Sequence, residues 1–337
     1  MTPPSFWSRH GALPRALQPI AALVARSTAR RIARPGWQAP IPVLCCGNAG
    51  VGGAGKTTLA LDLIHRLQAR GAIVHCLTRG YGGNVRGVLR VDPAQHPASL
   101  VGDEPLLLAA AAPTWVAADR TASARAAIAA GAGVLVMDDG LQNPGLVKTL
   151  SLLVVDGATG FGNGRVLPAG PLREPAAAAA ARCRAAILIG PDLSGARQAL
   201  PPGFPILAAS LLPSTDLHNA DLHNADLPNT DLPNTDLYGR RVLAFCGIAR
   251  PSKFYDTLRQ AGADLAATAS YPDHHRYTPA ELTHILTQAA ALGATPATTP
   301  KDAVRLPPGV RASVLVVGVT LAWADPAEIE ALLDELR

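Results

Sequence analysis

The residues best suited to chemistry in this sequence form a glycine-rich run that ends in Lys56 and Thr57. The run fits G-x-x-x-x-G-K-[ST], and its eight residues are Gly50, Val51, Gly52, Gly53, Ala54, Gly55, Lys56 and Thr57. In such a loop backbone N–H groups surround phosphate oxygens, the lysine reaches the β- and γ-phosphates, and the hydroxyl coordinates Mg²⁺. A flexible glycine turn would explain the glycines but not the Lys-Thr pair. We therefore predict that this run binds a nucleoside triphosphate.

A pair of carboxylates, Asp138 and Asp139, follows the apolar run 133–137. Such a run is typical of a strand buried on both faces, and a P-loop enzyme holds its metal at the C-terminal end of a strand of this kind. We predict that Asp138 and Asp139 join Thr57 as ligands of Mg²⁺. The alternative is a simple turn, for which Asp139-Gly140 is sufficient.

The segments around these residues predict an α/β protein. The apolar run 41–46 leads into the glycine loop, and Leu59, Leu63 and Leu67 then mark one face of a helix. Further strands are predicted at 73–77, 115–117, 133–137, 152–155, 186–189 and 206–208. This alternation predicts a P-loop NTPase-type, doubly wound, mostly parallel sheet. A second, smaller α/β unit is predicted from strands at 242–246 and 313–317 and helices at 251–260 and 278–292.

We divide the 337 residues into four parts: a basic helix at 1–40, a P-loop core at 41–212, an insertion at 213–237 and a smaller α/β domain at 238–337. The insertion repeats every five residues, with Asp-Leu pairs that start at 216, 221, 226, 231 and 236. A solenoid needs several coils to bury a core, and this segment has too few units. We interpret it as an expanded linker or ribbon insertion.

The positive charge of the chain is concentrated at its N-terminus. The net charge is +5, yet residues 1–40 hold six arginines and no acidic residue, which leaves −1 for the remainder. This distribution is not that of a nucleic-acid binder with a basic folded body. Leu13, Leu17, Ile20 and Leu23 recur at near-helical spacing, but the longest apolar run is too short to span a bilayer. We predict an amphipathic helix at a membrane interface; the alternative is a helix packed on the protein's own body.

The remaining motifs resemble the tetraacyldisaccharide 4′-kinases, the lipid A 4′-kinase family of Gram-negative bacteria. The matching stretches, beside the glycine loop, are residues 78–83, 102–105, 138–142, 161–164, 167–174, 245–249 and 272–275. They run in order from about residue 40 to 306. The sequence departs from the family pattern at Thr58 and Pro300, where proline and glutamate are usual, and at Tyr271, where phenylalanine is usual.

The resemblance implies an enzyme that transfers the γ-phosphate of ATP, with Mg²⁺, to the 4′-hydroxyl of an acylated glucosamine disaccharide 1-phosphate, giving lipid IVA. Such a substrate implies a peripheral enzyme on the cytoplasmic face of the inner membrane. Neither a nucleic acid nor a protein partner is implied.

The resemblance also implies roles for individual residues. Asp103 is the expected base and His274 its partner, although Asp103 also suits a helix cap and His275 is adjacent to His274. The expected contacts to the sugar and its phosphate are Arg79, Tyr81, Asn163, Arg173 and Glu174, each of which turn chemistry could also explain.

Two other functions fit a P-loop. A GTPase acting as a metallochaperone would need an N-K-x-D guanine-binding motif, and the sequence has none. A membrane-docked ATP-binding regulatory module would have no use for Asp103 or for the stretch 272–275.

Overall fold

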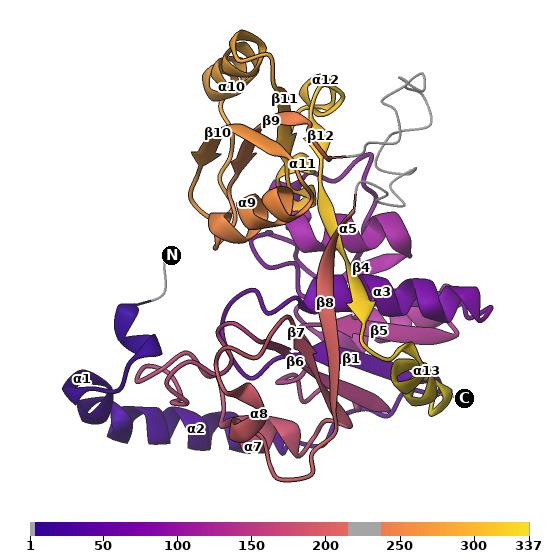
Figure 1. Cartoon of the computed structure of the whole chain (residues 1–337). Coiled ribbons are helices and arrows are strands. Elements are labelled where there is room, and N and C mark those ends of the chain that lie inside the picture. The colour runs from indigo at the N-terminus through magenta and orange to yellow at the C-terminus, as the bar shows by residue number, and fades with distance from the viewer. Residues whose placement is uncertain (1–3, 215–236, 337) are drawn as a thin grey trace.

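The computed structural model describes residues 4–214 and 237–336 of the chain, so most of the predicted repeat insertion lies outside the described residues. A nine-stranded sheet carries helices on both faces, and a four-stranded sheet forms a separate layer beside it (Figure 1). The predicted doubly wound sheet with a second, smaller α/β unit is therefore confirmed.

The large sheet has the strand order β13-β8-β7-β6-β1-β5-β2-β4-β3. Only its two edge strands, β13 and β3, run antiparallel to their neighbours. Its strands are β1 (Val43–Gly47), β2 (Val74–Thr78), β3 (Leu89–Arg90), β4 (Thr114–Val116), β5 (Val134–Asp138), β6 (Leu150–Asp156), β7 (Ala185–Ile189), β8 (Ile206–Ser214) and β13 (Gly318–Trp323). The inner strands β1, β2, β5, β6 and β7 are buried along their whole length, as parallel strands covered on both faces must be.

Helices cover the two faces of the large sheet with different side chains. One face packs leucines and isoleucines of α3 (Lys56–Ala69) and α13 (Pro326–Asp334), together with Leu108 of α5 (Asp103–Ala111). The other packs mainly alanines of α2 (Gln18–Ile32), α6 (Arg120–Ala129), α7 (Ala176–Ala180) and α8 (Ala196–Ala199). The small side chains on this second face let helices pack closely on the aliphatic strands, so a chain with few aromatic residues still fills its core.

The small sheet is parallel, with the order β10-β9-β11-β12. Its strands are β9 (Arg241–Cys246), β10 (Asp264–Ser270), β11 (Thr295–Thr298) and β12 (Leu315–Val316). Helix α9 (Pro251–Gln260) packs Phe254 and Leu258 on one face, and α10 (Pro279–Ala291) packs Leu282 and Ile285 on the other. Short helices α4 (Ala98–Val101), α11 (Pro300–Ala303) and α12 (Pro308–Arg311) lie in connecting loops.

The last residues of the chain return to the large sheet, which corrects the predicted domain boundary. Strand β13 pairs antiparallel with β8, and Ile329 and Leu333 of α13 are buried in the core that α3 lines. Residues 318–336 therefore belong to the large domain, and not to the smaller domain that we predict at 238–337. By pairing with β8, β13 covers an edge that would otherwise expose unpaired backbone groups. Strands β8 and β13 lie side by side: β8 leads toward the small domain and β13 leads back from it (Figure 1).

The N-terminal arm, residues 5–34, contains the predicted helix in two pieces, α1 (Ala12–Ala16) and α2. Ala21 is buried against the large domain, whereas Leu13, Ile20 and Leu23 are 52%, 51% and 65% exposed. One face of the arm therefore packs on the body and the other is open to solvent, while binding to a membrane stays a prediction. Among the described residues, no helix is long and apolar enough to cross a bilayer.

Candidate active site

The site lies where the C-terminal ends of the parallel strands of the two sheets meet. The loops that leave these ends are residues 48–55 after β1, 79–83 after β2, 139–142 after β5, 157–164 after β6, 247–250 after β9, 271–275 after β10 and 299–305 after β11. Contacts across the gap join Asp103 to His274 and Asp156 to Arg250. In open α/β sheets ligands bind outside these strand ends, so the topology alone gathers the candidate residues.

The glycine loop has the backbone shape that phosphate binding requires. Gly52 and Gly55 have φ values of +113° and +92°, which favour glycine, and helix α3 begins directly after Gly55. A Cβ at Gly52 or Gly53 would meet nothing within 4 Å, so the loop borders open space. The ammonium of Lys56 lies 3.4 Å from the carbonyl oxygen of Gly52. The loop, the helix N-terminus and the lysine together fit the triphosphate of a nucleotide.

Asp138 and Thr57 provide a fitting donor set for Mg²⁺. The Thr57 hydroxyl donates to Oδ2 of Asp138 over 2.9 Å, while the buried Oδ1 of Asp138 has no hydrogen-bond partner among the described residues. Burial is the main effect that raises the pKa of Asp138 to about 7, and the charge of Glu104 is the second. A cation beside this carboxylate would offset the free-energy cost of burying its negative charge. Residues 4–214 and 237–336 contain no cluster of three or more metal-binding side chains, so phosphate oxygens and water would have to complete the coordination.

Asp139 is engaged differently from its neighbour. Its two oxygens accept from Arg173 over 2.8 and 3.2 Å, and its Oδ1 lies 3.7 Å from the ammonium of Lys56. Burial would raise the pKa of Asp139, but the charges of Lys56 and Arg173 hold it below its usual value. These ion pairs favour Asp139 as the residue that positions Lys56 rather than as the predicted metal ligand.

Glu174 is buried and engaged by neighbouring side chains, so its predicted contact with the substrate stays a prediction. Both its oxygens accept from Arg182 over 2.7 Å. The amide of Gln142 also donates to it over 2.8 Å, and Gln142 Oε1 accepts from Arg173. Glu174 is therefore an internal anchor, because a buried carboxylate needs such partners. Arg173 is the member of this network that reaches the site.

Asn163 likewise holds the structure together instead of facing a substrate. Its buried amide donates to the carbonyls of Phe6 and Ala169 over 3.2 and 2.9 Å, and its oxygen accepts from the backbone of Arg165. The indole of Trp7 donates to the carbonyl of Pro168 in the same loop, residues 161–172, over 3.2 Å.

That loop is also attached to the glycine loop. The N–H of Val51 donates to the carbonyl of Pro171 over 2.9 Å. One loop therefore contacts the N-terminal arm at one end and the phosphate-binding loop at the other.

Asp103 and His274 form the predicted pair across the domain gap. Nδ1 of His274 lies 2.7 Å from Oδ2 of Asp103, which is buried. Asp103 is the first residue of α5, but Gly102 is the N-cap and no side chain caps the helix, so the geometry does not support the helix-cap alternative. His275 instead lies 3.1 Å from Glu281 and stacks on Tyr271. The choice between the two histidines is thereby resolved in favour of His274.

Arg305 is a residue of this site that the sequence analysis missed. Its Nε lies 3.2 Å from Oδ2 of Asp103 and its Nη2 lies 3.4 Å from Oδ1 of Asp302, which is fully buried. It also donates to the carbonyl of His275 over 2.9 Å. No pattern in the sequence marked Arg305, because it follows the end of α11 and its partner Asp103 is distant in the chain.

A second contact between the domains lies beside the pair. The ammonium of Lys301 lies 2.6 Å from Oε1 of Glu104. Lys301 and Arg305 therefore both bind the first turn of α5 from the small domain.

Tyr81 lies at the open side of the pair, and Arg79 precedes it in the loop after β2. Gly102 has a φ of +92°, and a Cβ there would come within 2.5 Å of the carbonyl of Tyr81, so glycine allows α5 to start against this loop. The Tyr81 ring is 71% exposed and its centroid lies 5.8 Å from that of His274. Arg79 is exposed and has no hydrogen bond or ion pair within the described part of the chain.

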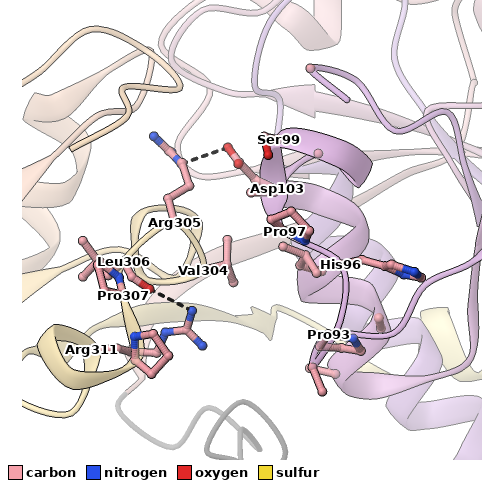
Figure 2. Close-up of a pocket in the computed structure, with 18 of the residues that line it drawn as sticks. Pro93, His96, Pro97, Ser99, Asp103, Val304, Arg305, Leu306, Pro307 and Arg311 are labelled. Carbon is pink, nitrogen blue, oxygen red and sulfur yellow. Dashed lines mark hydrogen bonds and ion pairs between the residues drawn. The ribbon is translucent and has the colours of Figure 1, made fainter. Parts of the chain in front are cut away.

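A pocket of about 890 Å³ extends from Asp103 and His274 along α5. Figure 2 shows its two walls, with Pro93 and His96 on one side and Val304, Leu306 and Pro307 on the other. Its size is that of a site for a small organic ligand. The residues that line it include Asp103 and His274 but none of residues 50–57.

Comparison with known proteins matches the chain to one family over most of its length. The family model described as tetraacyldisaccharide-1-P 4′-kinase matches residues 13–337. The tetraacyldisaccharide 4′-kinase of Gluconacetobacter diazotrophicus is 57% identical over 99% of this chain and 98% of its own, and that of Rhodospirillum centenum is 50% identical over 100% and 97%. The crystal structure of LpxK from Aquifex aeolicus in complex with ATP has a TM-score of 0.74, with 25% identity over 96% of this chain and 99% of that one.

The contact with Asp103 predicts how His274 titrates. The hydrogen bond to Asp103 raises the pKa of His274, and burial opposes it. Because the pKa is raised in the folded state, the contact stabilises the fold fully at pH values below the ordinary histidine pKa of about 6.5. This contribution is lost as the pH rises through the higher pKa of the folded state. We expect NMR titration of the His274 ring to give a higher pKa in the native protein than in Asp103→Asn. Equal pKa values in the two proteins would contradict the contact.

Proposed function

The chain belongs to the tetraacyldisaccharide 4′-kinase family and is an ATP-dependent kinase of lipid A biosynthesis, and we propose that Asp103 and His274 activate its acceptor hydroxyl. The observation that carries the proposal is the 2.7 Å contact between these two side chains, which brings together residues of the two domains. The reaction is transfer of the γ-phosphate of ATP to the 4′-hydroxyl of a tetraacyldisaccharide 1-phosphate, which gives lipid IVA.

The donor side of the reaction is assigned to the glycine loop. Lys56 supplies charge to the β- and γ-phosphates, and the backbone of residues 50–57 surrounds them. Thr57 and Asp138 would hold Mg²⁺, which neutralises charge on the β- and γ-phosphate oxygens when bound. Asp139 and Arg173 keep Lys56 in place through the ion pairs described above. Such positioning supports catalysis because phosphoryl transfer depends largely on orientation and on charge stabilisation.

The acceptor side is assigned to Asp103. Its carboxylate takes the proton of the 4′-hydroxyl while the hydroxyl oxygen bonds to the γ-phosphorus and the bond to the β-phosphate oxygen breaks, which releases ADP. His274 orients the carboxylate through its short hydrogen bond, and Arg305 holds the same oxygen from the buried side. Arg305 and His274 are thus the two side chains that position the carboxylate of Asp103.

The pocket along α5 suits the acylated sugar. Asp103 and His274 line it, so a ligand in it could present a hydroxyl to Asp103. Leu106, Val304 and Leu306 give it apolar wall, which fits an acyl chain, and Tyr81 offers an exposed ring at its mouth.

The exposed face of the N-terminal arm suits a membrane surface. Leu13, Ile20 and Leu23 are open to solvent, and Leu23 shares a shallow groove with arginines of α2. Apolar side chains that enter the interface and arginines that meet anionic headgroups are the features of peripheral binding. We infer that the arm holds the enzyme on the cytoplasmic face of the inner membrane, where its acylated substrate resides.

The base assignment predicts the behaviour of Asp103→Asn. Turnover should fall by about 10²–10⁴-fold, the usual effect of losing a general base, while ATP affinity stays near that of the native enzyme. His274→Ala should also slow turnover, and the double variant should be little slower than the slower single variant. Glu281→Gln is the matched control, because Glu281 contacts the neighbouring His275 and caps α10 but contacts neither Asp103 nor His274. Turnover of Asp103→Asn close to that of the native enzyme would move the base to another acid.

The pocket assignment predicts a selective effect of Ala109→Trp. The indole would fill space along α5, and we expect KM for the acylated disaccharide to rise about tenfold because overpacking carries a cost of this order, with KM for ATP unchanged. Ala69→Trp, on the exposed last turn of α3, controls for the substitution itself. A rise in KM for ATP instead would place the pocket on the donor side.

The arm assignment predicts weaker flotation with anionic liposomes for the triple variant Leu13→Ser, Ile20→Ser and Leu23→Ser. Ile73→Ser, an equally exposed apolar position outside the arm, is the control. Binding of the native enzyme should also weaken as salt rises, because arginine contacts to headgroups are worth about 1 kcal/mol each and are screened. Equal flotation of the triple variant and the native protein would refute the assignment.

A further inference from the structure

Asp302 of α11 is a carboxylate fully buried in the small domain. Its Oδ1 accepts from the N–H of Gly247 over 2.9 Å and from the hydroxyl of Tyr277 over 2.8 Å. Its Oδ2 accepts from the hydroxyl of Thr299 over 2.6 Å. Burial, and second the charge of Asp302, raise the pKa of the Tyr277 phenol, so Tyr277 is neutral and able to donate. Both oxygens of Asp302 are therefore held by donors from several loops.

The same carboxylate faces the guanidinium that pairs with Asp103. Nη2 of Arg305 lies 3.4 Å from Oδ1 of Asp302, and Nε of Arg305 lies 3.2 Å from Oδ2 of Asp103. The side chain of Arg305 is only 6% exposed, so these two carboxylates rather than water compensate its charge. Because a guanidinium is planar and rigid, two anionic partners fix its orientation. Asp302 therefore determines how Arg305 meets Asp103.

Asp302 also reaches the loop that carries His274, through the peptide of Gly247. The N–H of Gly247 donates to Asp302, and the carbonyl of Gly247 accepts from the N–H of His274 over 3.1 Å. The same carbonyl accepts from Nη2 of Arg305 over 3.3 Å. His274 has a φ of +59°, which residues other than glycine rarely adopt, so the contacts around it must hold it there. The position of His274 thus depends on a peptide that Asp302 fixes.

We propose that Asp302 is a positioning residue for the phosphate transfer, which holds Arg305 and the loop of His274 in the arrangement that orients Asp103. The inference rests on the proposed function, since it takes Asp103 as the base. Arg305 and His274 both contact Oδ2 of Asp103, and both are tied to the one buried carboxylate. A misplacement of about 1 Å can cost 10²-fold in rate, so we expect this arrangement to matter for turnover.

The alternative is that Asp302 only stabilises the fold of the small domain, as a buried and hydrogen-bonded carboxylate can. The two explanations differ in what they predict when Asp103 is also changed. A positioning residue acts through Asp103, so Asp302→Asn should slow the native enzyme but have little further effect in Asp103→Asn. A general loss of fold stability would slow both proteins by the same factor.

The test measures turnover and the NMR titration of His274 in the full-length native enzyme, in Asp302→Asn, in Asp103→Asn and in the double variant. Asparagine keeps the volume and one acceptor oxygen but removes the charge that faces Arg305. We expect kcat of Asp302→Asn to fall by about 10- to 100-fold, with KM for ATP unchanged. The pKa of His274 should fall toward its ordinary value of about 6.5, because its contact with Asp103 loosens. The double variant should be within about twofold of Asp103→Asn.

Tyr255→Phe is the matched control for the loss of a buried hydrogen bond in the same domain. The hydroxyl of Tyr255 lies 2.9 Å from that of Ser270, and Tyr255 packs in the core under α9. We expect its kcat and its His274 titration to match those of the native enzyme. If thermal unfolding shows that Asp302→Asn is not folded, Tyr277→Phe replaces it, because this change removes one donor to Oδ1 and keeps the carboxylate.

An unchanged kcat or an unchanged His274 pKa in Asp302→Asn would overturn the proposal. So would an equal loss of turnover when Asp302→Asn is added to the native enzyme and to Asp103→Asn. A failure of the base assignment is recognised separately, by native turnover of Asp103→Asn alone. The titration needs no substrate, so in that case it still shows whether Asp302 positions the pair.

Discussion

Two buried carboxylates of the large domain, Asp103 and Asp156, take their positive partners from the small domain, and the arrangement of the site depends on this pairing. An ionised group in a protein interior costs several kcal/mol unless a partner compensates it. Neither carboxylate has enough partners within its own domain to meet that cost. The two sheets must therefore face each other with their C-terminal strand ends, and the loops that leave those ends become the site.

The features that sequence alone predicted are those in which neighbouring residues carry the information. The glycine loop, its Lys56 and the carboxylate of Asp138 are defined by local spacing after a strand, and each lies where the pattern required. The Asp103–His274 contact joins residues far apart in the chain, and only the family resemblance suggested it. The alternation of apolar runs was enough to predict the doubly wound sheet, because strands buried on both faces leave no polar positions.

The features that sequence did not predict depend on partners that are distant in the chain. Asn163 and Glu174 have the residue types of a sugar-binding site, and only their buried hydrogen bonds show that they anchor loops. Strand β13 is a short, mostly apolar run that could have covered either sheet, and only its pairing with β8 assigns it to the large one. Arg305, Arg250 and Lys253 gain their importance from carboxylates on the other domain, which no local pattern contains.

The loop at residues 161–172 gives the enzyme a fixed orientation. It holds the arm through Asn163 and Pro168 and the phosphate-binding loop through Pro171. The angle and the height of the nucleotide above any surface on which the arm rests are therefore set within the large domain, whatever the position of the small domain. Because these contacts lie within residues 5–172, the position of the small domain does not alter the tilt of the phosphates relative to that surface. The lipid acceptor thus meets a donor whose direction of approach is already determined.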